Sequence, residues 1–212
     1  MEEVRIGVLV SGGGTNLQAL IDACQEGKIN GQVVLVISNR EDAYALERAS
    51  QKGIRNKFVS PSSFRGEDYD RRLVELLEQE EVQLVVLAGY LRVLSPAFID
   101  RFRNRIINIH PSLIPKFCGK GFYGERVHRA VLESGVEQTG ATVHMVDEGT
   151  DTGPIILQEK VPVMEEDTVE SLQKRVLQVE HRILVKAVGE MCLKLGNENN
   201  GGNHEESIDQ RL

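Results

Sequence analysis

The stretch VRIGVLVSGGGTN, residues 4–16, decides the fold class of this chain. Its first part, Val4–Ser11, is a short apolar run that ends at three consecutive glycines. The following residues, Asn16–Glu26, carry apolar side chains at helical spacing. A strand that passes through a glycine turn into a helix is the opening unit of a parallel α/β sheet.

The same unit recurs along the first half of the chain. Each expected strand is rich in β-branched or other apolar residues, and each expected helix has apolar residues three or four positions apart. After the first pair we expect strands at 33–38, 56–59, 84–88 and 105–110 and helices at 44–52, 68–80 and 96–102, with Ser95 as the N-cap of the last helix. This order predicts a single α/β domain with an open, mostly parallel twisted sheet flanked by helices and a Rossmann-like N-terminal half.

The second half is less regular. We expect a long loop at 111–127, a short helix near 128–133, strands at 141–146 and 155–163, and one long helix at 169–195. Residues 196–212 are polar and rich in Gly and Asn, a composition typical of a disordered tail. The domain is therefore expected to span residues 1–195.

Composition excludes several classes of protein. A length of 212 residues suits one domain, and the net charge of −7 gives no basic footprint for nucleic acid. No apolar run is long enough for a membrane span, and the N-terminus lacks the features of a signal peptide. Cys24, Cys118 and Cys192 are far apart, which argues against disulfides and favours the reducing cytoplasm.

The glycine loop before the first helix predicts an anion site, because backbone N–H groups and the helix dipole both favour negative charge there. A dinucleotide loop would need Gly where Leu17 stands, and the GK[ST] of a P-loop is absent. The loop suits one phosphate monoester, with Thr15 and Asn16 as additional donors. The alternative is a tight turn in which Thr15 or Asn16 only caps the helix.

Asn108 and His110 lie two residues apart at the end of an expected strand, so they project from the same face. Pro111 prevents the strand from continuing. An amide donor beside a histidine that titrates near neutral pH suits a reaction with an oxyanion-like transition state. The alternative is a histidine at a strand end that is hydrogen-bonded to the backbone.

A carboxylate for His110 is expected from the turn DEGTDTGP, residues 147–154, in which Asp151 could point inward. We expect Asp151 to raise the pKa of His110 and to orient its ring. Asp and Gly also dominate turns for purely conformational reasons, which is the alternative. Thr142 and His144 share a face of the preceding strand and could line the same cleft. No set of His, Cys and carboxylates has zinc spacing, so no metal is expected.

Together these stretches resemble the phosphoribosylglycinamide (GAR) formyltransferases, the folate-dependent enzymes of purine biosynthesis. The resemblance is carried by VLVSGGGTNLQALIDA (8–23), VISNR (36–40), LAGYLRVLSPAFI (87–99), INIHPSLIPKF (107–117), GATVHMVDEGTDTGPIILQ (140–158) and QVEHRILVKAV (178–188). It extends over residues 4–195. It implies the formyltransferase fold, with a phosphate-binding half at about 1–105 and a catalytic, folate-binding half at about 106–195.

The resemblance also implies roles for individual residues. Asn108, His110 and Asp151 match the catalytic residues of the family. The phosphate and the ribosyl group of GAR would be bound by Gly14, Thr15, Asn16 and Glu180. The folate would be bound by Leu91, Arg92, Val93, Leu94, Asn108, Val146, Asp147 and Glu148, with Arg65 at its glutamate tail. Thr142 and His144 match positions that line the site.

The implied reaction moves a formyl group from 10-formyltetrahydrofolate, the co-substrate, to the amine of GAR, without a metal. The expected partners are these small molecules and, at most, a second copy of the chain, since monomer and homodimer both remain open; nucleic acid and membranes are not expected. The alternatives are a formyltetrahydrofolate deformylase, another N-formyltransferase such as methionyl-tRNA formyltransferase, and a non-catalytic phosphosugar-binding module. The stretch CGKGFYGERV, residues 118–127, is longer than in familiar family members, so no role is transferred to it.

Overall fold

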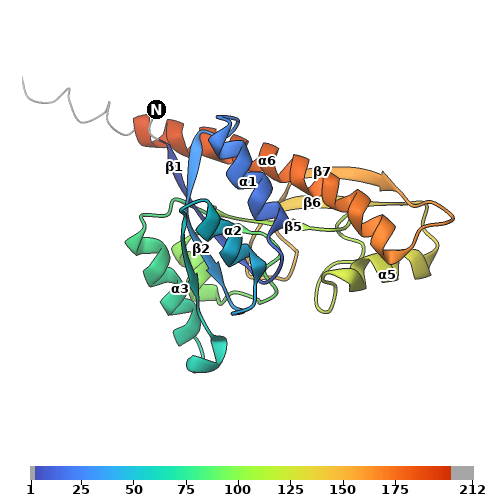
Figure 1. Ribbon diagram of the computed structural model, residues 1–212, viewed down its shortest axis with the longest axis horizontal. Coiled ribbons are helices and arrows are strands. Elements are labelled where there is room, and N and C mark those ends of the chain that lie inside the picture. Colours follow the sequence, from blue (N-terminus) through green and yellow to red (C-terminus); the bar gives the residue numbers. More distant parts are fainter. Residues whose placement is uncertain (1–2, 202–212) are drawn as a thin grey trace, which may run out of the picture.

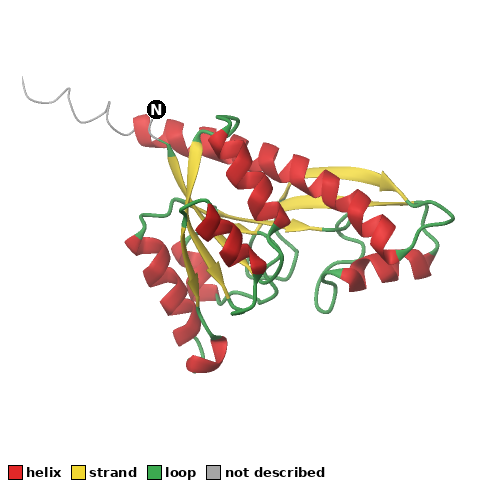
Figure 2. Cartoon of the chain, in the orientation of Figure 1, coloured by secondary structure: helices red, strands yellow, loops and turns green. Residues whose placement is uncertain are grey.

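The computed structural model describes residues 3–201 (Figures 1 and 2). Its elements are β1 (Val4–Val10), α1 (Thr15–Gln25), β2 (Gly31–Ser38), α2 (Tyr44–Gln51), β3 (Arg55–Phe58), η1 (Pro61–Ser63), α3 (Asp68–Gln79), β4 (Leu84–Leu87), α4 (Pro96–Arg101), β5 (Ile106–His110), α5 (Glu125–Ser134), β6 (Gln138–Met145), β7 (Ile155–Pro162) and α6 (Val169–Gly201). The expected alternation of strands and helices in the first half is confirmed.

One sheet of seven strands runs through the molecule in the order β3-β2-β1-β4-β5-β6-β7. Strands β1 to β5 are parallel, whereas β6 and β7 are antiparallel to their neighbours. The predicted open, mostly parallel sheet is therefore confirmed. The strand order reverses between β1 and β4, and such a reversal opens a crevice at the carboxyl ends of the strands.

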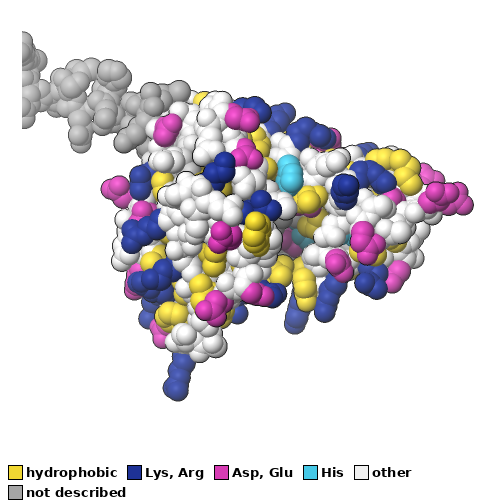
Figure 3. Space-filling model, viewed as in Figure 1, with side chains coloured by type: hydrophobic (Ala, Val, Ile, Leu, Met, Phe, Trp, Pro, Cys, Tyr) yellow, Lys and Arg dark blue, Asp and Glu magenta, His cyan; other side chains and the backbone are white. Residues whose placement is uncertain are grey.

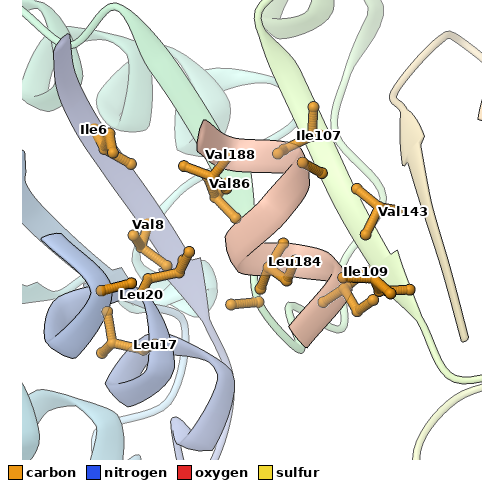
Figure 4. Packing of buried hydrophobic residues seen from close by; sticks show 14 of the residues in the cluster. Ile6, Val8, Leu17, Leu20, Val86, Ile107, Ile109, Val143, Leu184 and Val188 are labelled. Atoms are coloured by element: carbon orange, nitrogen blue, oxygen red, sulfur yellow. The ribbon is translucent and has the colours of Figure 1, made fainter. Parts of the chain in front are cut away.

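Helices cover both faces of the sheet. Helices α1, α2, α5 and α6 pack on one face, and α3 and α4 pack on the other. Figure 4 shows side chains of β1, β4, β5 and β6 meeting those of α1 and α6, with Val8, Leu20 and Leu184 among them. Each fully buried side chain of this size contributes roughly 1.5–3 kcal/mol to folding. The two faces explain why the strands read as continuous apolar runs.

Several element boundaries differ from the expectation. Helix α5 begins at Glu125, and β6 begins at Gln138 because its first residues pair with the end of β7. Helix α6 continues to Gly201, beyond the helix end expected at residue 195. No proline interrupts this stretch, and Gly196 inside a helix costs only about 1 kcal/mol. The rest of the expected tail, 202–212, lies outside the described residues.

The N-cap role of Ser95 is confirmed, because its hydroxyl accepts the N–H of Phe98 at 3.3 Å. The face of the molecule seen in Figure 3 carries basic and acidic side chains interspersed with one another. Within residues 3–201, no helix combines the length and the apolar composition that a membrane crossing requires.

Gly14 is the residue that fixes the turn between β1 and α1. Its φ of 71° lies in the left-handed region, and an added Cβ would lie 2.6 Å from Cβ and 2.8 Å from Cα of Ala45. Only glycine satisfies both constraints. Helix α2 therefore packs directly against the glycine loop.

We expect Gly14→Ala to destabilise the fold by at least about 2 kcal/mol, from backbone strain and overlap together. Urea unfolding measures the change. Gly13→Ala is the matched control, since its Cβ would meet nothing within 4 Å and its φ is not positive. Equal stability of the two variants would contradict the assignment.

Candidate active site

A cavity of about 750 Å³ opens at the carboxyl ends of the strands, within the range of small-molecule sites. Four of its segments follow the ends of β1, β4, β5 and β6, and α6 covers one side. The lining includes Ser11–Asn16, Gly89–Leu94, Asn108–Pro111, Gly119–Gly124, Val146, Asp147, Gly149–Asp151, Gln173, Leu177 and Glu180. The predicted glycine loop and the predicted Asn/His/Asp set thus share one cavity.

The glycine loop has the geometry of an anion site. Gly14 is the N-cap of α1, and no side chain caps the helix, so the capping alternative for Thr15 and Asn16 is wrong. Two bonds hold the loop from outside: Nε of Arg48 donates to the carbonyl of Gly13 at 2.8 Å, and the N–H of Ala45 donates to the carbonyl of Gly12 at 3.1 Å. The N-terminal N–H groups of α1 are left for a ligand.

Asn16 and Glu180 form a buried pair that joins α1 to α6. Nδ2 of Asn16 donates to Oε2 of Glu180 at 2.7 Å, and Oδ1 of Asn16 is buried without a hydrogen-bond partner among residues 3–201. Burial raises the pKa of Glu180, and the bond from Asn16 only partly opposes that shift. A buried, unpaired acceptor beside a buried carboxyl suits a ligand that carries hydroxyl donors.

The carboxylate of Asp151 lies close to two histidines inside the cavity. This position agrees with the inward orientation expected for Asp151. Its φ of 57° is left-handed, which turns the carboxylate inward from the β6–β7 turn. Oδ2 lies 3.7 Å from Nδ1 of His110, and Oδ1 lies 3.5 Å from Nε2 of His144. The N–H of Gly119 also donates to Oδ2 at 2.8 Å. One carboxylate therefore contacts β5, β6 and the long loop.

Main-chain carbonyls fix which ring nitrogens carry hydrogen. Nε2 of His110 donates to the carbonyl of Phe117 at 2.9 Å, and Nδ1 of His144 donates to the carbonyl of Met145 at 2.7 Å. A carbonyl oxygen only accepts, so both of these nitrogens must be protonated. Asn108 faces His144 across the β5–β6 pair, with Nδ2 of its amide 3.1 Å from Nε2 of the ring.

The expected rise in the pKa of His110 is wrong. Burial lowers the pKa of His110, and this effect exceeds the opposing influence of the Phe117 carbonyl and of Asp151. For Asp151 itself, burial acts to raise the pKa, but the adjacent rings of His144 and His110 and the N–H of Gly119 together lower it. The site therefore holds a neutral imidazole beside an ionised carboxylate near neutral pH.

The segment after β4 forms an apolar wall of the cavity. Leu91 and Val93 are exposed by 51% and 69%, and the N–H of Leu91 donates to Oγ of Ser11 at 2.9 Å. The guanidinium of Arg92 stacks over the ring of Tyr69 at 4.9 Å from its centroid. All four residues predicted in Leu91–Leu94 line the cavity, as do Val146 and Asp147.

Three predicted site residues do not line the cavity. Glu148 pairs with Arg103 at 2.7 Å on the surface, and Arg65 is exposed in the connection from η1 to α3. Thr142 is fully buried behind the cavity, where its hydroxyl donates to the carbonyl of Ser112 at 2.6 Å. Of the two residues predicted to line the site from β6, only His144 does so.

Sequence reasoning missed other lining residues. Leu177 and Gln173 precede Glu180 by one and two turns of α6, so helical spacing could have revealed them. His128, at the expected start of the helix near 128–133, is 1% exposed and lines the cavity. Burial, and then the neighbouring His110, lower the pKa of His128 to about 4. Among residues 3–201, no group of His, Cys and carboxylates is arranged to bind a metal.

We predict that Glu180→Gln flattens the pH dependence of stability. The folded-state pKa of Glu180 lies above its ordinary 4.5, so the folded state binds this proton more tightly than the unfolded chain does. Stability is then lost as pH rises from 4.5 through the raised value. The glutamine still accepts from Asn16 and does not ionise, so the variant should be the more stable protein at neutral pH.

Urea unfolding in acid and at neutral pH measures this difference. The control is Glu190→Gln, an exposed residue of the same helix, which should keep the wild-type slope. Parallel pH profiles for wild type and Glu180→Gln would contradict the prediction.

Comparison with known proteins places this cavity in a family context. The model of the formyl transferase family matches residues 4–188 of this chain. The chain is 46% identical to phosphoribosylglycinamide formyltransferase of Escherichia coli over 85% of its own length and 83% of that protein. It is 44% identical to the chloroplastic phosphoribosylglycinamide formyltransferase of Arabidopsis thaliana over 89% of its length, and it spans 65% of that relative.

Solved structures agree with the sequence matches. Glycinamide ribonucleotide transformylase 1 from Symbiobacterium toebii is 48% identical, with a TM-score of 0.86, over 91% of this chain and 89% of that one. A formyltetrahydrofolate deformylase from Pseudomonas syringae has a TM-score of 0.82 but only 25% identity, and the chain covers 62% of it. On the family pattern and these identities, the chain belongs to the formyl transferase family and groups with its phosphoribosylglycinamide formyltransferases.

Proposed function

We propose that this chain transfers the formyl group of 10-formyltetrahydrofolate to the primary amine of phosphoribosylglycinamide (GAR), giving formyl-GAR and tetrahydrofolate. The observation that carries the proposal is the convergence of Asn108, His110 and Asp151 with the Gly12–Asn16 loop in one cavity. An anion site beside an amide, an imidazole and a carboxylate suits a phosphorylated amine that attacks a formyl carbon.

In the proposed complex, GAR binds along the edge formed by β1 and α6. Its phosphate occupies the N-terminus of α1, where Gly14, Thr15 and Asn16 present backbone N–H groups. The ribose hydroxyls lie between Oδ1 of Asn16 and the carboxyl of Glu180. The unpaired Oδ1 of Asn16 then gains the donor that it lacks in the free protein.

The folate is proposed to bind against the segment after β4. Leu91–Leu94 offers an apolar wall and backbone groups to the pterin, and Val146 and Asp147 close the opposite side. The exposed side chains of Leu91 and Val93 would be covered by the bound ring system. Since Arg65 and Glu148 lie off the cavity, a role for them requires that the folate extend beyond it.

The chemistry is direct attack of the amine on the formyl carbon. The developing oxyanion accepts an N–H from Asn108. His110 donates to it as well once its Nε2–H exchanges the Phe117 carbonyl for the formyl oxygen. The C–N10 bond of the folate then breaks, and the proton lost by the amine is passed to N10 through His110 or water, with Asp151 stabilising the charged ring.

The acceptor separates this proposal from its alternatives. A deformylase uses water, and a binding module forms no product. The presence of a loop suited to one phosphate, together with the buried Asn16–Glu180 pair, favours an acceptor that carries a phosphate and hydroxyls. We also propose a cytoplasmic location. The three cysteines are all free in the structure, as is usual in a reducing compartment.

We expect Asn108→Ala and His110→Ala each to lower kcat by roughly 10²–10³-fold, the usual loss when one oxyanion donor is removed. Asp151→Asn should lose a comparable or smaller factor. Formyl transfer is followed with 10-formyltetrahydrofolate and GAR, and with the folate alone.

Arg101→Gln is the matched surface control, because Arg101 pairs with Glu78 on α3, away from the cavity. Transfer that depends strictly on GAR supports the proposal. Hydrolysis without GAR identifies a deformylase, and binding of both ligands without turnover identifies a binding module. Near-wild-type turnover of a folded His110→Ala variant would refute the assigned mechanism.

A further inference from the structure

We propose that His144 is a positioning residue that sets the direction of the Asn108 amide, and hence whether a donor or an acceptor faces the formyl oxygen. The inference rests on the proposed function, since it concerns the proposed oxyanion donor. His144 lies opposite Asn108 in the antiparallel β5–β6 pair, at the rim of the same cavity. It acts on the reaction only through its neighbour.

The tautomer of His144 is the first step. Nδ1 lies 2.7 Å from the carbonyl of Met145, which can only accept, so Nδ1 carries hydrogen. In the neutral ring, Nε2 then presents a lone pair. The ring is 2% exposed and lies on β6, which is paired with a strand on each side, so it is held in this orientation.

The second step concerns the amide. The Nε2 lone pair lies 3.1 Å from Nδ2 of Asn108, which is a donor, so the two groups match. Within the described part of the chain, this is the one hydrogen bond recorded for the Asn108 side chain. The terminal torsion of asparagine has two nearly equivalent orientations that exchange the oxygen and the NH₂. Without His144, no hydrogen bond from residues 3–201 would distinguish them.

The consequence follows from the two hydrogens of the NH₂ group. One is bound by His144, and the other remains for the oxyanion. In the exchanged orientation, the amide oxygen would take the place of that donor and repel the oxyanion. His144 therefore keeps the Asn108 amide in its donor orientation. One oxyanion donor typically contributes roughly 10²–10³-fold to turnover.

The carboxylate of Asp151 competes with Asn108 for Nε2 of His144. Its Oδ1 lies 3.5 Å from the same Nε2, so a protonated ring would donate to the carboxylate and would cease to accept from Asn108. The residue at position 144 must thus offer an acceptor to the amide. A carboxamide oxygen can do so, and an alkyl group cannot.

A double-mutant cycle tests the proposal. His144→Leu alone should lower kcat by about tenfold or more, while the KM values for GAR and folate change much less, because the lost interaction belongs to the transition state. If His144 acts through Asn108, then adding His144→Leu to Asn108→Ala should cause no further loss. Losses that multiply in the double variant would overturn the proposal.

His144→Gln separates positioning from packing. Glutamine is close to leucine in size, and its side-chain oxygen can accept from Asn108. We expect it to recover at least about tenfold of the kcat lost in His144→Leu, at similar thermal stability. Equal activity of the Gln and Leu variants would overturn the proposal, as would a loss of kcat that simply follows a loss of stability.

A spectroscopic readout is independent of turnover. In ¹⁵N-labelled wild-type protein, the His144 signals, identified by their absence in His144→Gln, should show hydrogen on Nδ1 and an unprotonated Nε2. Hydrogen on Nε2 in the neutral ring would overturn the inference. A wild-type protein with the expected tautomer but no GAR-dependent transfer would instead overturn the proposed function and, with it, the kinetic role of His144.

Discussion

The geometry of the site depends on the carboxylate of Asp151. It contacts the rings of His110 and His144 at 3.7 and 3.5 Å and accepts the N–H of Gly119 at 2.8 Å. It therefore ties together two strands, the β6–β7 turn and the long loop after β5. Its left-handed backbone costs roughly 1–3 kcal/mol, which these contacts must offset. Without these contacts, nothing would compensate for a charged side chain that points into the cavity.

Sequence patterns predicted the sheet well because its physical cause is local. Strands buried on both faces must be apolar throughout, and that requirement is visible in the residues themselves. The period of two along a strand likewise placed Asn108 and His110 on one face, and both line the cavity. The end of α6 was misjudged, because a polar, glycine-containing composition does not by itself end a helix that packing has already formed.

The environment of each side chain was harder to predict. Thr142 and His144 share a face of β6, yet one is buried behind the cavity and the other lines it. Glu148 lies within three residues of Asp151 but pairs with a surface arginine. The pKa of His110 is lowered mainly by burial, which depends on the whole fold and on no single nearby residue. Adjacency in sequence identified the right segments and could not decide which side chains turn inward.

The lowered pKa of His110 has a consequence for the proposed reaction. Because Nε2 of His110 donates to a main-chain carbonyl, the other nitrogen of its neutral ring, Nδ1, carries no hydrogen and faces the Asp151 carboxylate. A ring with a raised pKa would hold a proton there before the reaction starts, and it could not take one from the attacking amine. A buried, neutral His110 can accept that proton, and the adjacent carboxylate stabilises the charge that results. Burial thus suits His110 to the role of a base at the moment of attack, and Asp151 becomes most important after the proton has moved.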